Sequence, residues 1–133
     1  MSENLNLVRS IVADWERGDF ASADWADPEI ESGWADGPSP GARIGLAAMA
    51  ETERDFLNAW ADVRIEADKY RELDRQRVLV FIQASGRGKT SGLAFGQMGT
   101  AGASLFHISD GKVTKLVNYW DHNRALADLG LKE

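Results

Sequence analysis

The first half of the chain carries apolar residues at helical spacing. Residues 3–18 predict an amphipathic helix that Gly18 ends, since an apolar residue returns every three or four positions. Its inward positions are Leu5, Val8, Ile11, Val12 and Trp15. Residues 44–60 repeat this spacing and predict the longest helix of the chain. A shorter helix is predicted over residues 20–25, with Asp19 as its N-cap.

The second half changes to the alternation of β-strands. Residues 63–71 alternate apolar and polar positions, which predicts a partly exposed antiparallel strand. Residues 78–82 are almost continuously apolar, as in a central strand buried on both faces. A third strand is predicted to begin near Ser91, and the glycine-rich run 96–102 predicts a bend that curls the sheet around a cavity.

The clearest local signal is a hairpin near the end of the chain. Residues 105–113 run into residues 116–121, and within this stretch two strand-like runs flank Asp110-Gly111, a dipeptide that favours a tight turn. A helical tail is predicted over residues 123–131, and a short strand with a following loop over residues 29–41. Helices followed by four consecutive antiparallel strands predict a single α+β domain over residues 1–133.

Composition narrows the classes of partner. The formal net charge is −6, which argues against binding to nucleic acid or to an anionic membrane surface. The chain has no cysteine, so it has no disulfide and no thiolate metal site. No segment has the length and apolar character of a membrane span or the pattern of a signal peptide, and we expect a cytoplasmic protein.

The last strand presents one residue that needs an explanation. Alternation places Val117, Tyr119 and Asp121 on one face and their neighbours on the other. An ionised carboxylate at the end of an apolar row is costly unless it is paired or solvated. Asp121 is therefore the first candidate for a functional residue.

Several short motifs follow one another in an informative order along the whole chain. They are Gly18-Asp19-Phe20, Asp27-Pro28-Glu29-Ile30, Asp110-Gly111-Lys112-Val113, Tyr119-x-Asp121 and Ala125-Leu126-x-x-Leu129-Gly130-Leu131. In this arrangement the chain resembles the SnoaL-like branch of the nuclear transport factor 2-like superfamily. The resemblance implies a cone-shaped α+β fold, with N-terminal helices on a strongly curved, mostly antiparallel sheet that encloses an apolar pocket. It also implies a homodimer through the outer face of the sheet.

The resemblance assigns expected places to the residues of the last strand. Val117, Tyr119 and Asp121 would line the pocket, whereas Leu116, Asn118 and Trp120 would lie outside, at the dimer interface. Asp121 stands where SnoaL-like cyclases carry the acid that moves a proton, and an apolar pocket raises the pKa of such a carboxyl. The alternative is that Asp121 caps the following helix.

Tyr119 has two interpretations of the same kind. Its hydroxyl could hydrogen-bond a substrate oxygen or an enolate, or the residue could be a core aromatic whose hydroxyl is satisfied elsewhere. Further residues are candidates for contact with a ring-containing ligand, and they are Trp15, Trp34, Phe56, Trp60, Gln97, His107 and Val117.

Other conspicuous residues are interpreted as structural. The two histidines lack metal-ligand spacing. The run 86–90 lacks the first glycine of a phosphate-binding loop and is read as a hairpin turn. Glu51, Glu53 and Asp55 are interpreted as the solvated face of the long helix.

Two functional hypotheses follow. In the first, the protein encloses a small apolar or aromatic, polyketide-like molecule and is a cofactor-independent isomerase, cyclase or dehydratase with Asp121 as general acid/base. In the second, it is a non-catalytic ligand-binding or dimerisation module in which Asp121 is a helix cap. The two differ in where the Asp121 carboxylate lies.

Overall fold

The protein has three helices and a seven-stranded sheet, seen in a computed structural model that describes residues 2–20, 22–36, 40–88, 94–95 and 101–132. The helices are α1 (Glu3–Glu16), α2 (Leu46–Ala59) and α3 (His122–Leu129). The strands are β1 (Ala26–Trp34), β2 (Gly41–Ile44), β3 (Trp60–Glu72), β4 (Arg77–Gly88), β5 (Ala94–Phe95), β6 (Ala101–Ser109) and β7 (Lys112–Tyr119). The α+β class predicted from the sequence is confirmed.

The sheet runs in the order β2-β1-β7-β6-β4-β3, with β5 paired to β4. Most neighbours are antiparallel, but β1 pairs in parallel with β7, as in the pair Glu31 and Lys115. The sheet is thus mostly antiparallel, as expected. The parallel pair joins distant parts of the chain, and no local pattern of the sequence marks it. The start of the strand expected near Ser91 lies outside the described residues.

Local signals placed most elements correctly. The hairpin turn is formed by Asp110 and Gly111, whose φ angles of 51° and 77° are the left-handed values that this tight turn requires. The short helix expected over residues 20–25 is wrong, since the described residues there are not helical and β1 begins at Ala26. Trp25 is buried there, and its indole N–H donates to the carbonyl of Ser22. Burial of this large ring in the core outweighs a weak helical pattern of two turns.

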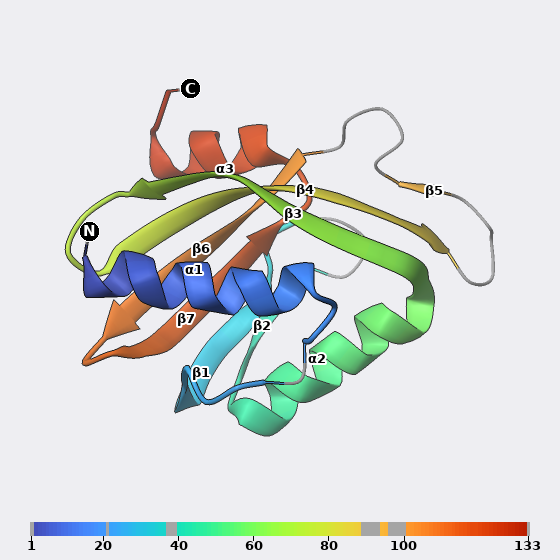
Figure 1. The fold of residues 1–133 in the computed structure, drawn as a ribbon, viewed down its shortest axis with the longest axis horizontal. Coiled ribbons are helices and arrows are strands. Elements are labelled where there is room, and N and C mark those ends of the chain that lie inside the picture. Colours follow the sequence, from blue (N-terminus) through green and yellow to red (C-terminus); the bar gives the residue numbers. More distant parts are fainter. Residues whose placement is uncertain (1, 21, 37–39, 89–93, 96–100, 133) are drawn as a thin grey trace.

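Figure 1 shows α1 and α2 on one side of the sheet and α3 on the other. On the α1 side, called here the inner face, Val8, Ile11, Val12 and Trp15 pack with sheet residues such as Phe106 in the main core. On the opposite, outer face, a second cluster forms where α3 packs on β6 and β7. None of the described helices is long and apolar enough to cross a membrane.

Candidate small-molecule pocket

A pocket of about 120 Å³ lies between the inner face of the sheet and helices α1 and α2. Strands β1, β6 and β7 supply its floor, and β3, β4, α1 and α2 supply its walls. Aliphatic and aromatic side chains dominate the lining, among them Met49, Leu57, Ile65 and Ile82. Such a lining suits an apolar ligand, because removing apolar surface from water on binding makes the free energy of binding more favourable.

One end of the pocket is walled by aromatic rings. Trp34 stacks on Trp120, with ring centroids 5.1 Å apart, and on Phe56 at 5.7 Å. Trp60 contacts the same group, with its ring centroid 5.8 Å from that of Trp120. These rings come from β1, α2, β3 and the end of β7, so the wall forms only when the whole fold is assembled.

The floor contains a small polar group within this apolar lining. Asn118 lies beside Trp34 in the pairing of β7 with β1, and beside Ser104 in the pairing of β7 with β6. The Ser104 hydroxyl donates to the Asn118 side-chain oxygen at 2.8 Å. On β1, Ser32 is buried, and its hydroxyl has no hydrogen-bond partner in the described part of the chain.

Glu53 is the one charged side chain among the described residues that line the pocket. It comes from α2, where Met49, Phe56 and Leu57 share its face at helical spacing. Burial raises the pKa of the Glu53 carboxyl to about 7, and the negative charge of Asp19 adds to the effect. Its carboxyl therefore exchanges a proton near neutral pH.

Glu53 is a site residue that sequence analysis missed. Its assignment to the solvated face of α2 is wrong, since the residue is half-buried and lines the pocket, whereas Glu51 and Asp55 are exposed. The signal that could have identified it was its position four residues after Met49 and three before Phe56, both inward-facing. No group of side chains suited to a metal ion is found among the described residues.

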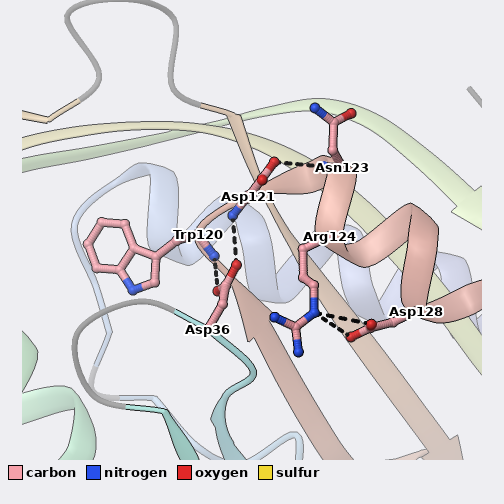
Figure 2. Close-up of polar contacts among 6 residues, drawn as sticks. All are labelled: Asp36, Trp120, Asp121, Asn123, Arg124 and Asp128. Atoms are coloured by element: carbon pink, nitrogen blue, oxygen red, sulfur yellow. Dashed lines mark hydrogen bonds and ion pairs between the residues drawn. The ribbon is translucent and has the colours of Figure 1, made fainter.

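The Asp121 carboxylate lies at the N-terminus of α3, where it accepts a hydrogen bond from the Asn123 backbone N–H at 2.9 Å. Figure 2 shows this cap together with Asp36, whose carboxylate accepts from the backbone N–H groups of Trp120 at 2.7 Å and Asp121 at 3.2 Å. Asp121 is exposed, and it is not among the residues that line the pocket in the described chain. This is the geometry expected if Asp121 caps the following helix, rather than if it lines the pocket.

The two faces of β7 are the reverse of the expected assignment. Leu116, Asn118 and Trp120 line the pocket rather than the outside of the sheet. Val117 packs against the outer cluster, so it does not hold the place expected for a ligand contact. The alternation itself was right, but both faces of the strand are apolar, and alternation alone does not say which one a helix layer covers.

Tyr119 borders the pocket but belongs to the outer cluster. Burial and the negative charge of Asp128 on α3 raise the pKa of the Tyr119 phenol. Tyr119 packs in the outer cluster, in line with its interpretation as a core aromatic.

The remaining candidates divide between the two faces. Trp15, Trp34 and Phe56 line the pocket, and Trp60 contacts its aromatic wall. His107 lies between two residues of the inner core, Phe106 and Ile108, so its side chain projects from the outer face. Burial and the nearby cation Lys115 lower its pKa. Gln97 lies outside the described residues.

These features define an α+β cone with an apolar inner pocket, and solved structures share the fold. A protein of unknown function with a nuclear transport factor 2-like fold, from Burkholderia pseudomallei, superposes with a TM-score of 0.76 over 96% of this chain and 97% of its own, at 18% identity. A proposed SnoaL-like polyketide cyclase from Jannaschia is similar over 98% and 94%, with a TM-score of 0.73 and 14% identity.

A third similar structure is TerC, co-crystallised with polyporic acid, with a TM-score of 0.71 and 18% identity over 96% of this chain and 98% of that one. No protein-family model and no curated protein matches the sequence. The chain therefore has the nuclear transport factor 2-like fold that the motifs predicted, while likeness at this level of identity carries no activity with it.

Proposed function

We propose that this protein binds a small, largely apolar or aromatic molecule in the inner pocket and that Glu53 moves a proton on it. The observation that carries the proposal is a carboxyl with a pKa of about 7 in a lining of apolar and aromatic side chains. A carboxyl with such a pKa serves as both acid and base near neutral pH. The co-crystallisation of TerC with a small molecule supports a binding role for the fold.

The chemistry that suits this site is cofactor-independent proton transfer. Glu53 in its ionised form takes a proton from a carbon next to a carbonyl group, which leaves an enolate, and then returns the proton to another atom. Isomerisation, aldol-type cyclisation and dehydration all contain such a step. In this proposal Glu53 is the general acid/base, the role expected for Asp121 from the sequence. The Asp121 carboxylate instead accepts a hydrogen bond at the N-terminus of α3.

The first test is exchange of carbon-bound hydrogen for deuterium in a two-ring ketone, 2-tetralone, followed by NMR in heavy water. The wild-type protein should accelerate this exchange above the buffer rate. Glu53→Gln should reduce the acceleration about 100-fold or more, because proton transfer by a positioned acid or base supplies an effect of this order. Asp121→Asn, which keeps a capping oxygen, is the matched control and should exchange at the wild-type rate.

The position of Asp121 also supports a second candidate function, a ligand-binding module without catalysis. The exchange test separates the two when binding is measured alongside it, by the change in tryptophan fluorescence from the aromatic wall. Binding with acceleration that depends on Glu53 supports the enzyme. Binding without acceleration in the wild type contradicts the enzyme and leaves the module. Acceleration lost in Asp121→Asn rather than in Glu53→Gln would return the catalytic role to Asp121.

A further inference from the structure

Among the described residues, Ser32 has a buried side chain that lacks a hydrogen bond. The residue is 4% exposed, and its hydroxyl has no partner among the described residues. An unmade hydrogen bond in the interior destabilises the folded state, so buried polar groups are nearly always paired. Ser32 also borders the pocket, and a single rotatable bond separates its hydroxyl from the backbone. A partner for this hydroxyl can therefore come from a bound ligand.

Asn118 presents a second polar group on the same floor. The register places Ser32 opposite Leu116 and Trp34 opposite Asn118, so Ser32 and Asn118 are diagonal neighbours on adjacent strands. The Ser104 hydroxyl donates to the Asn118 side-chain oxygen. The NH2 group of the same amide is then left to donate to a ligand. Ser104 is itself buried, and it holds the amide in this orientation.

The charges of the pocket restrict which ligand group can meet these donors. Glu53 is the one charged side chain in the described lining, and Asp19 adds a negative charge near it. An anionic ligand would be repelled by this carboxyl and would find no lysine, arginine or histidine in the same part of the lining. A neutral oxygen, such as that of a carbonyl or a hydroxyl, avoids this cost and accepts hydrogen bonds from both donors.

We infer that Ser32 and Asn118 bind one neutral oxygen atom of the ligand, and that the ligand is an apolar ring compound carrying a carbonyl or hydroxyl group. Ser104 acts as a positioning residue, because it orients the Asn118 amide. The inference rests on the proposed function, since it names the ligand class for the same pocket. Specificity then resides in the floor of the pocket, on β1 and β7, while the aromatic wall accepts the body of the ligand.

The experiment compares a ketone with its hydrocarbon, 2-tetralone with tetralin, by titration of the intact protein followed by tryptophan fluorescence. The wild type should bind the ketone about 5 to 100 times more tightly than the hydrocarbon, as two neutral hydrogen bonds together supply an effect of this order. Ser32→Ala should reduce this preference about three- to tenfold, the effect of one such bond, and leave the affinity for tetralin unchanged. Ser10→Ala, which changes an exposed serine of α1, should keep the wild-type preference.

Two further measurements test whether Ser32→Ala acts through the lost hydrogen-bond donor or through a loss of stability. Ser32→Ala should unfold at a urea concentration equal to or higher than that of the wild type, because it removes an unpaired hydroxyl rather than a contact. Asn118→Ala should also reduce the preference for the ketone. If Ser32→Ala loses stability or weakens both ligands equally, Ser32 is a structural residue and the inference is wrong.

The outcomes also separate this inference from the proposed function. Equal binding of ketone and hydrocarbon by the wild type would overturn the oxygen site and leave the apolar pocket in place. Binding of neither compound up to its solubility limit would contradict the pocket function itself. Preference for the ketone that survives in both Ser32→Ala and Asn118→Ala would also overturn the inference, since the oxygen would then be held elsewhere.

Discussion

Glu53 is a half-buried carboxyl on a helix whose other acids are exposed. Its neighbours on α2, Glu51 and Asp55, have the same charge but face solvent. About half a turn of helix separates Glu53 from each of them, which places Glu53 on the buried side. Burial penalises its ionised form and so raises its pKa. A carboxyl in this position stays protonated at a pH where an ordinary glutamic acid has ionised.

This shift of pKa predicts how stability depends on pH. The Glu53 pKa is 4.5 without the fold and about 7 within it, so the folded state binds more protons than the unfolded state between these values. The protonated Glu53 side chain favours the folded state. This stabilisation is complete below pH 4.5, and it is lost as the pH rises through 7. Glu53→Gln, which carries no charge, should be more stable than the wild type above pH 7. The difference in the free energy of unfolding, measured in urea, should be about 1 to 2 kcal/mol, because solvent still reaches part of the carboxyl.

Asp55→Asn is the matched control, since it removes an exposed carboxylate two residues further along the same helix. Its stability relative to the wild type should not vary with pH in this way. A constant difference between Glu53→Gln and the wild type from pH 5 to pH 8 would show that the Glu53 carboxyl is not desolvated. The acid/base role proposed for it would then lose its physical basis.

At the scale of elements, the junction between β7 and α3 is held by two carboxylates. Asp121 caps α3, while Asp36, from the segment after β1, binds the backbone of Trp120 and Asp121 (Figure 2). Within α3, Arg124 and Asp128 form an ion pair at 3.1 Å. The junction thus fixes the direction in which the chain leaves the pocket wall and enters the helix.

The cap predicts the result of changing Asp121. Asp121→Ala should lower the free energy of unfolding by about 1 kcal/mol, because the N-terminal N–H groups of α3 lose their side-chain acceptor. Asp121→Asn should stay close to the wild type, since asparagine caps about as well as aspartate. Urea titrations of the three proteins measure both effects. Equal loss of stability in the two variants would mean that the charge matters more than the cap.

The elements themselves could largely be predicted from the sequence, and the reason is that their signals are local. The helical spacing of α1 and the Asp110-Gly111 turn act within a few residues, and both are found where expected. The side of β7 that faces the pocket could not be predicted in this way. It depends on α1 and α2 covering one face of the sheet and α3 the other, which involves parts of the chain far from β7.

The same limit explains the outcome for the candidate site. Large aromatic residues such as Trp34 and Phe56 were predicted to lie at the pocket because few other places suit so many rings. Ser32 and Asn118 gave no such signal, since a serine and an asparagine are ordinary on any surface, and Glu53 was marked only by its helical spacing from other inward-facing residues. Only the folded structure shows that all three border one apolar cavity.

At the scale of the whole molecule, the homodimer through the outer sheet face stays a prediction. The half-buried residues Phe81 and Val117 lie on this face, next to the cluster that α3 covers. Sedimentation of the wild type at micromolar concentration should therefore show a dimer, and Val117→Lys should shift it to a monomer, because a charge placed in an apolar interface is costly.

Ile44→Lys is the control, since Ile44 is the most exposed of the large apolar residues in the described chain, at 69%, and lies on the edge strand β2, which β1 separates from β7. It should leave the dimer intact. Dissociation by Ile44→Lys and not by Val117→Lys would place the contact at the edge of the sheet, and a monomeric wild type would contradict the prediction altogether.

The parallel pairing of β1 with β7 also determines when the pocket can exist. About eighty residues separate Glu31 from its partner Lys115. At synthesis rates of roughly 5–20 residues per second, β1 leaves the ribosome about 4 to 16 s before the strand that completes it. During that interval Trp34 has neither Asn118 beside it nor Trp120 to stack on. The nascent chain therefore carries an unfinished sheet edge until its last strand emerges.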